Sequence, residues 1–131
     1  MTEPIIESFE IPLYGGLFDI VFTTKKTKVR ELYETKKHGN FNLEYAETVY
    51  DRKNVDGKKL RVILVSFNSN NKYKQLSHGT IAHECFHAVS FATNVAGIPH
   101  TSESEEAYAY LIGWMVDTVY DVAKKHKIRI H

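Results

Sequence analysis

Hydrophobic and polar residues alternate along the first half of the chain in short runs that are typical of β-strands. Phe9–Leu13 and Phe18–Thr23 flank Tyr14-Gly15-Gly16, where paired glycines supply the backbone freedom that a tight turn needs. We therefore predict that these two runs form a hairpin. Pro12 has no backbone donor, so the first strand is expected at a sheet edge or interrupted at that residue.

A second hairpin is predicted further along the chain. Leu43–Tyr50 alternates between apolar and polar residues, and Leu60–Phe67 reads as a β-rich, largely buried strand. The segment between them contains Asp56-Gly57, a strong turn dipeptide. Ahead of this hairpin, Lys25–Lys37 is mostly polar with a few apolar residues at helical spacing, which predicts a short helix.

The second half of the chain changes to helical spacing. Thr80–Asn94 carries apolar residues around much of its circumference, which predicts a buried helix, and Gly97 and Pro99 end it. These apolar residues are Ile81, Ala82, Phe86, Val89 and Phe91.

A second helix is predicted after this break. Ser102 or Ser104 is suited to cap it, and Glu105 and Glu106 place negative charge in its first turn, where it complements the helix dipole. Its apolar face consists of Tyr108, Leu111, Ile112, Met115, Val116 and Val119. The pattern predicts an α+β fold in which a small antiparallel sheet packs on two helices.

Size and composition narrow the class of protein. The 131 residues suit a single domain, 1–131, with 1–75 mainly β plus the short helix and 76–131 mainly α. With 17 basic and 16 acidic residues, the net charge of +1 gives no reason to expect a nucleic acid or a membrane as partner. Met1–Pro4 does not resemble a signal peptide, and Cys85 is the single cysteine, so we expect a cytoplasmic protein.

The residues with the clearest chemistry are His83-Glu84-Cys85-Phe86-His87, within the first predicted helix. Histidines four residues apart project from the same side of a helix and can hold one zinc ion. Glu84 follows the first histidine directly, so its carboxylate can reach a metal-bound water without occupying the metal. Since zinc lowers the pKa of such a water to about 7, Glu84 is the expected general base.

A catalytic zinc site uses three protein ligands and a water. The second helix and the residues before it offer Glu103, Glu105 and Glu106 as the third ligand. Spacing alone leaves these carboxylates as alternatives.

Residues 80–113 resemble the gluzincin group of zinc metallopeptidases, and within it the small zincin-like proteins encoded by phages. In that group the ligand Glu is followed three and seven residues later by small residues, which allow the two helices to pack closely. Glu106, followed by Ala109 and Gly113, matches this pattern better than Glu105. The resemblance therefore implies a zincin-like fold, Zn²⁺ held by His83, His87 and Glu106, and a phage protein acting in its host's cytoplasm.

Two further features follow from the resemblance. Many gluzincins have Asp or Asn four residues after the ligand Glu, where it supports a ligand His, but here that residue is Tyr110. The outer ligand support therefore differs in this chain. Leu60–Phe67 is similar to the edge strand that borders the substrate cleft in zincins.

Other polar residues have simpler interpretations. Tyr108, Tyr110 and His100 are candidates for stabilising an oxyanion, but core packing is favoured for the tyrosines and an exposed loop for His100. Cys85 is favoured as a small buried thiol, and His78 as a loop or capping residue. A basic cluster, formed by Lys25, Lys26 and Lys28, is interpreted as a solvated turn. The C-terminal segment, Ile128–His131, is predicted to be either a short strand or frayed.

The sequence thus predicts a zinc-dependent metallohydrolase, most simply a peptidase that acts on a peptide or protein substrate. Glu84 is its predicted catalytic residue, and His83, His87 and Glu106 are its predicted metal ligands. The alternative is a catalytically inactive zinc-binding module that acts by binding a partner.

Overall fold

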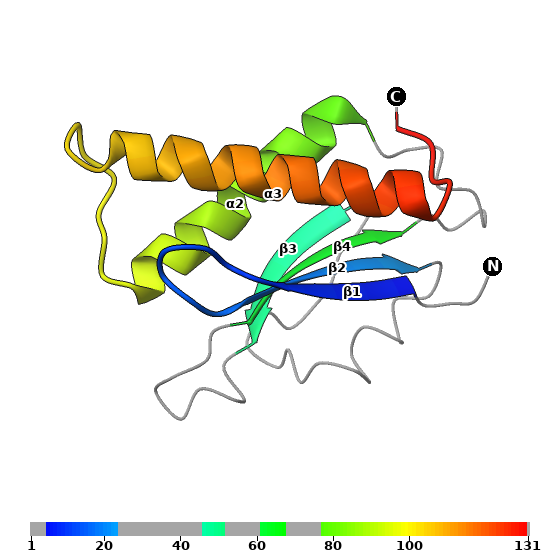
Figure 1. Ribbon diagram of the computed structural model, residues 1–131, viewed down its shortest axis with the longest axis horizontal. Helices are drawn as coiled ribbons and strands as arrows, with labels where there is room; N and C mark the ends of the chain where they lie inside the picture. The colour runs from blue at the N-terminus through cyan, green and yellow to red at the C-terminus, as the bar shows by residue number, and fades with distance from the viewer. Residues whose placement is uncertain (1–4, 24–45, 52–60, 68–76, 131) are drawn as a thin grey trace.

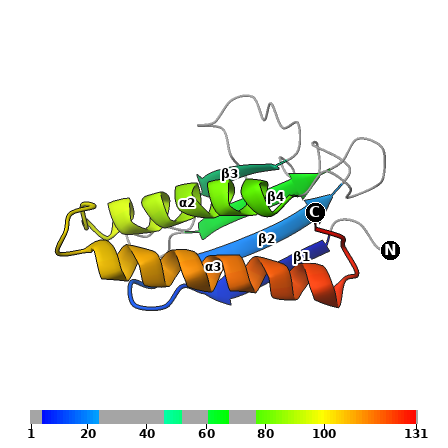
Figure 2. The same cartoon turned by 90° about the horizontal axis from the view of Figure 1, so that it is seen from above.

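The computed structural model describes residues 5–23, 46–51, 61–67 and 77–130. Within these residues a four-stranded sheet forms one layer, and two helices lie together on one of its faces (Figure 1). Seen from above, α2 (His78–Val95) runs over the part of the sheet that contains β3 and β4, and α3 (Glu105–Lys125) runs beside it (Figure 2). The α+β class is therefore confirmed.

The predicted helix at Lys25–Lys37, with its lysine cluster, and the turn at Asp56-Gly57 lie outside the described residues.

The sheet contains β1 (Ile5–Glu10), β2 (Leu17–Thr23), β3 (Ala46–Asp51) and β4 (Arg61–Phe67), in the spatial order β1-β2-β4-β3. The outer pairs, β1–β2 and β3–β4, are antiparallel, as predicted for the two hairpins. The predicted first strand, Phe9–Leu13, was wrong in its bounds, because β1 ends at Glu10 and the chain turns at Pro12. The central pair, β2–β4, is parallel, so the sheet is mixed rather than wholly antiparallel. Strand polarity within a hairpin follows from its short connection, whereas the pairing of two hairpins depends on tertiary packing.

The edge of the sheet near α2 is β3, and not the strand predicted for that place. We expected Leu60–Phe67 to border the site, but β4 pairs with a strand on each side and is an inner strand. The prediction of a strand was correct for β4, and a continuous β-rich run is typical of a strand with neighbours on both sides.

The turn between β1 and β2 confirms the role predicted for Pro12. Pro12 comes just after β1, which is an edge strand. Two backbone hydrogen bonds close the turn, each 2.9 Å long. The Ile11 amide donates to the Gly16 carbonyl, and the Tyr14 amide donates to the Pro12 carbonyl. The backbone φ angles of Leu13, Gly15 and Gly16 are all positive, at 72°, 75° and 92°. Glycine adopts such angles freely, while Leu13 is strained there and exposes its side chain.

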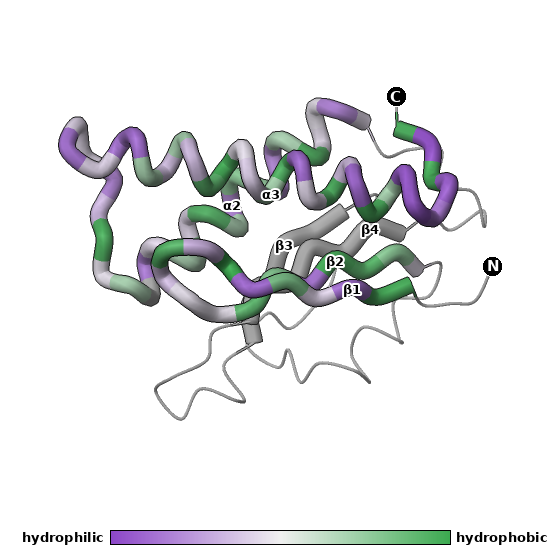
Figure 3. The backbone as a smooth tube through the Cα atoms, in the orientation of Figure 1, coloured by the Kyte–Doolittle hydropathy of each residue, from purple (hydrophilic) through white to green (hydrophobic). Residues whose placement is uncertain are grey.

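The hydrophobic core lies between the sheet and the two helices. Phe18, Ile20 and Phe22 of β2 are fully buried in it, and Phe18 contacts Trp114 of α3 with ring centroids 6.0 Å apart. Along α3, hydrophilic and hydrophobic residues alternate at helical spacing (Figure 3). This pattern explains why one side of α3 lies against the sheet and the other faces solvent.

Helix α2 differs from the prediction in one respect that matters for the site. Its inner side is buried, but Ala82 and Phe86 are exposed, so α2 is a half-exposed helix and not a buried one. The buried apolar residues are Ile81, Cys85, Ala88, Val89 and Ala92. Only one side of a helix can lie against a sheet, and these residues already fill that side, so Phe86 is left on the outer side.

The helix ends follow local rules. Ser77 caps α2 by accepting a hydrogen bond from the Thr80 amide at 3.0 Å, while Ser104 precedes α3 but makes no side-chain cap hydrogen bond. Both helices end in Schellman motifs, with a left-handed residue just after the helix, Gly97 for α2 and Lys127 for α3. After the second motif Ile128 is buried, so the chain is neither a strand nor frayed at that residue.

These left-handed residues lead to a stability prediction. Lys127 has a φ of 58°, a conformation that costs a residue with a Cβ atom about 1–2 kcal/mol. Lys127→Gly removes this cost, but glycine also gives the unfolded chain more conformational freedom. The net expectation is that the free energy of unfolding rises by about 0.5 kcal/mol. Gly97→Ala, at a φ of 75°, is expected to lower it by about 1 kcal/mol. Urea unfolding followed by circular dichroism measures both changes. Equal stability of all three proteins would contradict the prediction.

An ionic cluster joins the first strand to the end of the last helix. One Glu7 carboxylate oxygen lies 3.0 Å from Lys125 Nζ, and the other lies 2.7 Å from His126 Nε2. Burial acts to raise the pKa of Glu7, but the hydrogen bonds and positive charge of His126 and Lys125 outweigh burial and hold that pKa below its usual value of 4.5. The charged carboxylate therefore stabilises the fold.

The sign of this pKa shift predicts how stability depends on pH. The stabilisation from Glu7 is fully present above pH 4.5 and is lost as the pH falls through the lowered pKa of the folded state. At pH 7, Glu7→Gln is expected to lower the free energy of unfolding by about 0.5–1 kcal/mol, since the partners are partly exposed. The difference from the wild type should shrink in strongly acidic buffer. Glu10→Gln, at an exposed residue of the same strand, is the matched control and should show neither effect.

Candidate metal centre

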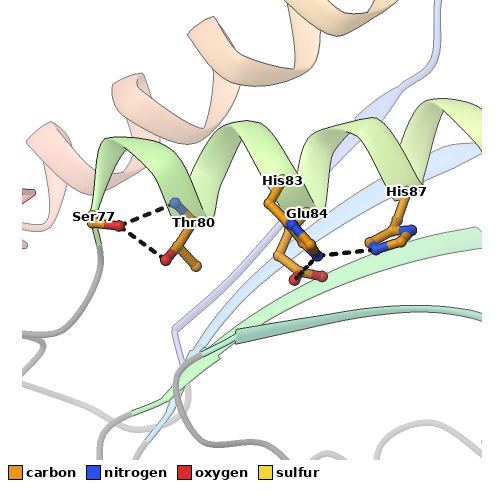
Figure 4. Close-up of polar contacts among 5 residues, drawn as sticks. All are labelled: Ser77, Thr80, His83, Glu84 and His87. Atoms are coloured by element: carbon orange, nitrogen blue, oxygen red, sulfur yellow. Dashed lines mark hydrogen bonds and ion pairs between the residues drawn. The ribbon is translucent and has the colours of Figure 1, made fainter.

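One turn of α2 brings three polar side chains together. His83, Glu84 and His87 project from the same side of the helix, next to the edge of the sheet formed by β3 (Figure 4). Helical spacing places the two histidines one turn apart, as the sequence predicted. The buried apolar residues of α2 hold the helix against the core, so the three polar groups are carried on a rigid element.

The two histidines have the separation that a metal ion requires. Their Nε2 atoms lie 3.2 Å apart, and the rings meet nearly edge to face at 73°. Two nitrogens bound to one zinc ion at about 2.0–2.1 Å, with a tetrahedral angle between them, are themselves about 3.3 Å apart. The pair therefore fits two adjacent positions of a tetrahedral zinc site. The His83 side chain is 67% exposed, so an ion can reach the pair from solvent.

Glu84 is differently placed from its two neighbours. Only 9% of its surface is exposed, and its Oε2 atom lies 3.7 Å from His83 Nε2. A carboxylate at this distance lies beside the histidine pair and is shielded from bulk water. A hydrogen bond to such a group is electrostatically stronger than one on an open surface.

Cys85 is a buried thiol next to Glu84. Its side chain is fully buried, and burial, together with the nearby Glu84 carboxylate, raises the pKa of the thiol to about 12. The thiol is therefore neutral at physiological pH and does not act as a nucleophile. This confirms the interpretation of Cys85 as a small buried side chain.

None of the three predicted acidic ligands is brought into a metal-binding group with the histidine pair in the described part of the chain. Glu103, Glu105 and Glu106 are all exposed, and among the described residues no three His, Cys, Asp or Glu side chains form a group that can hold a metal ion. Tyr120 of α3 contacts His78 of α2. Glu105 lies on the same side of α3 as Tyr120, because helical spacing connects it to Tyr120 through Ile112 and Val116. Glu106 lies on the exposed side of α3.

The packing role predicted for Ala109 and Gly113 is wrong. Both residues are exposed, and no atom lies within 4 Å of the place where a side chain would begin at Gly113. The close approach of the helices therefore does not depend on these small residues. The reason for preferring Glu106 over Glu105 came from this packing, so the structure gives that preference no support.

The candidates for oxyanion stabilisation have other roles. Tyr108 is buried, donates a hydrogen bond from its hydroxyl to the Ile98 carbonyl at 2.7 Å, and packs against His100 with ring centroids 4.5 Å apart. His100 is an exposed loop residue, as predicted. Tyr110, for which core packing was predicted, is 52% exposed because it lies on the outer side of α3.

His78 is the first residue of α2 and does not cap it. Its Nδ1 atom contacts the Tyr120 hydroxyl of α3, and the two rings stack with an interplanar angle of 20°. This contact ties the beginning of α2 to the second half of α3. His78 therefore has a structural role outside the histidine pair.

Comparison with known proteins gives this chain no family: no family model, no curated protein and no solved structure matches it. No helix in the described ranges is both long enough and apolar enough to cross a lipid bilayer.

Proposed function

We propose that this protein is a zinc-dependent metallohydrolase that cleaves peptides or proteins. The observation that carries the proposal is the Nε2–Nε2 separation of 3.2 Å between His83 and His87, with the buried Glu84 carboxylate 3.7 Å from one of them. This combination supplies two nitrogen ligands of the kind that zinc prefers and a proton acceptor that is not needed as a ligand.

Each residue has a distinct task in this proposal. His83 and His87 bind zinc through their Nε2 atoms, which requires both rings to be neutral and to carry the remaining proton on Nδ1. Zinc held by these residues would polarise a substrate carbonyl and would lower the pKa of a coordinated water to about 7. Glu84 accepts the proton of the attacking water on its carboxylate and later delivers it to the leaving amine.

The third ligand is proposed to be a carboxylate in the first turn of α3. Glu106 is the candidate from the resemblance to gluzincins, and Glu105 is the candidate from its position on the side of α3 nearer to α2. A carboxylate from α3 would fix the charge of the site and would join the two helices through the metal. Either residue leaves a fourth position for water or substrate.

An inactive zinc-binding module is the second candidate. The exposure of Glu105 and Glu106 favours it, because a pair of histidines without a third ligand binds a metal but does not position it for catalysis. The experiment that separates the two functions is the Glu84→Gln variant, assayed against denatured casein with its zinc content measured alongside. An enzyme loses hydrolysis and keeps zinc, whereas an inactive module has no hydrolysis to lose.

A further inference from the structure

The outer side of α2 has an unusual surface for a helix in contact with water. Of the residues in α2 whose exposure is described, none of the exposed ones carries a formal charge; they are His78, Gly79, Ala82, His83, Phe86, His87 and Asn94. Helix α3 shows the ordinary pattern, because six of its nine exposed residues are charged, namely Glu105, Glu106, Asp117, Asp121, Lys124 and Lys125. The uncharged surface is thus specific to the helix that carries the histidine pair.

Phe86 is the large apolar residue on this surface. Its side chain is 48% exposed, and its ring lies beside that of His87, with centroids 6.4 Å apart and planes at 62°. Other exposed large hydrophobic residues of the described chain lie elsewhere, on β1, in its turn and on α3 (Ile6, Leu13 and Tyr110). Phe86 therefore presents an apolar face to solvent within one helical turn of both proposed metal ligands.

We propose that Phe86 determines substrate specificity by contacting an apolar side chain next to the scissile bond. A substrate held at the histidine pair passes close to Phe86, because His87 and Phe86 are neighbours and their rings touch. An apolar substrate side chain removes the exposed face of Phe86 from water, which favours binding. This inference rests on the proposed hydrolytic function and adds the class of substrate to it.

The surroundings of Phe86 also disfavour charged substrate side chains. A charged group placed against Phe86 loses hydration, and the exposed positions of α2 offer it no opposite charge. The charge on the inner side of this turn belongs to Glu84, which is buried and turned towards the sheet edge. We therefore expect the preference to be for Phe, Leu or Met over Ala, and for Ala over Glu or Lys.

The first test uses the zinc-loaded wild-type protein with blocked pentapeptides of the form acetyl-Ala-Ala-Xaa-Ala-Ala-amide, in which Xaa is Phe, Leu, Ala or Glu. Cleavage on either side of Xaa is followed by mass spectrometry. The Phe peptide is expected to be cleaved with a kcat/KM about tenfold higher than the Ala peptide, through a lower KM. In Phe86→Ser this ratio should fall to below about threefold, while Phe86→Leu should retain most of it. Leu13→Ser, at another exposed apolar residue, is the matched control and should leave the ratio unchanged.

The second test measures binding without cleavage. Zinc-loaded Glu84→Gln protein is titrated with the same four peptides, and the dissociation constants are obtained from NMR chemical shifts with and without the Phe86→Ser change. Tighter binding of the Phe peptide that disappears with Phe86→Ser supports the proposal, and equal binding of all four peptides overturns it.

The two tests separate this inference from the proposed function. Cleavage of all peptides at equal rates leaves the hydrolase in place and overturns the role of Phe86. The wild type can also fail to cleave any peptide while it binds the Phe peptide through Phe86. This result contradicts the hydrolytic function and supports an apolar binding site beside the metal. No cleavage and no selective binding overturn both.

Discussion

Glu84→Gln protein is expected to hydrolyse denatured casein about 10²–10⁴-fold more slowly than the wild type, because general acid–base catalysis contributes an effect of that size. Glutamine has nearly the same shape as glutamate and keeps an oxygen that accepts hydrogen bonds, but it does not take up a proton at neutral pH. The change therefore removes the proton transfers and leaves the histidine pair intact. Zinc content, measured by inductively coupled plasma mass spectrometry, should match that of the wild type.

The control for this prediction is the same chemical change at a distant carboxylate. Glu10→Gln, at the end of β1, should retain both the activity and the zinc of the wild type. Full activity in Glu84→Gln would remove the catalytic role of Glu84. Loss of zinc in that variant would instead mean that Glu84 supports the metal.

His83→Ala is expected to weaken zinc binding by more than about 100-fold, since even the loss of an outer partner of a ligand commonly costs 10–100-fold. The variant removes one of the two nitrogens that lie 3.2 Å apart and leaves a single histidine on this turn of α2. Competition with a chromogenic chelator measures the affinity. His100→Ala, at an exposed loop histidine, is the matched control and should bind zinc as tightly as the wild type.

The same measurement identifies the third ligand. Glu105→Gln and Glu106→Gln change neighbouring residues in the same first turn of α3, so they share any general effect on the helix dipole. The ligand is the residue whose change weakens zinc binding, while its neighbour serves as the control. If neither change affects affinity, α3 supplies no ligand and the three-ligand site proposed here is wrong.

The sequence alone predicted the features of this protein that depend on neighbours along the chain. Local patterns account for the pairing of β1 with β2 and of β3 with β4. They also account for the end of α2 just before Gly97 and for the acidic first turn of α3. The placement of His83, Glu84 and His87 on one side of a helix is of the same kind. A helix repeats every 3.6 residues, so a four-residue spacing determines the relative direction of two side chains before any tertiary contact forms.

Only the tertiary structure decided how these elements meet. It made β3 rather than β4 the strand at the edge, it left Phe86 in contact with solvent, and it placed Ala109 and Gly113 away from α2. Each of these outcomes depends on which side of an element faces the core, and several sides of α2 carry apolar residues. Local hydrophobicity shows that a segment can be buried, but the available area of the sheet determines which of its residues are.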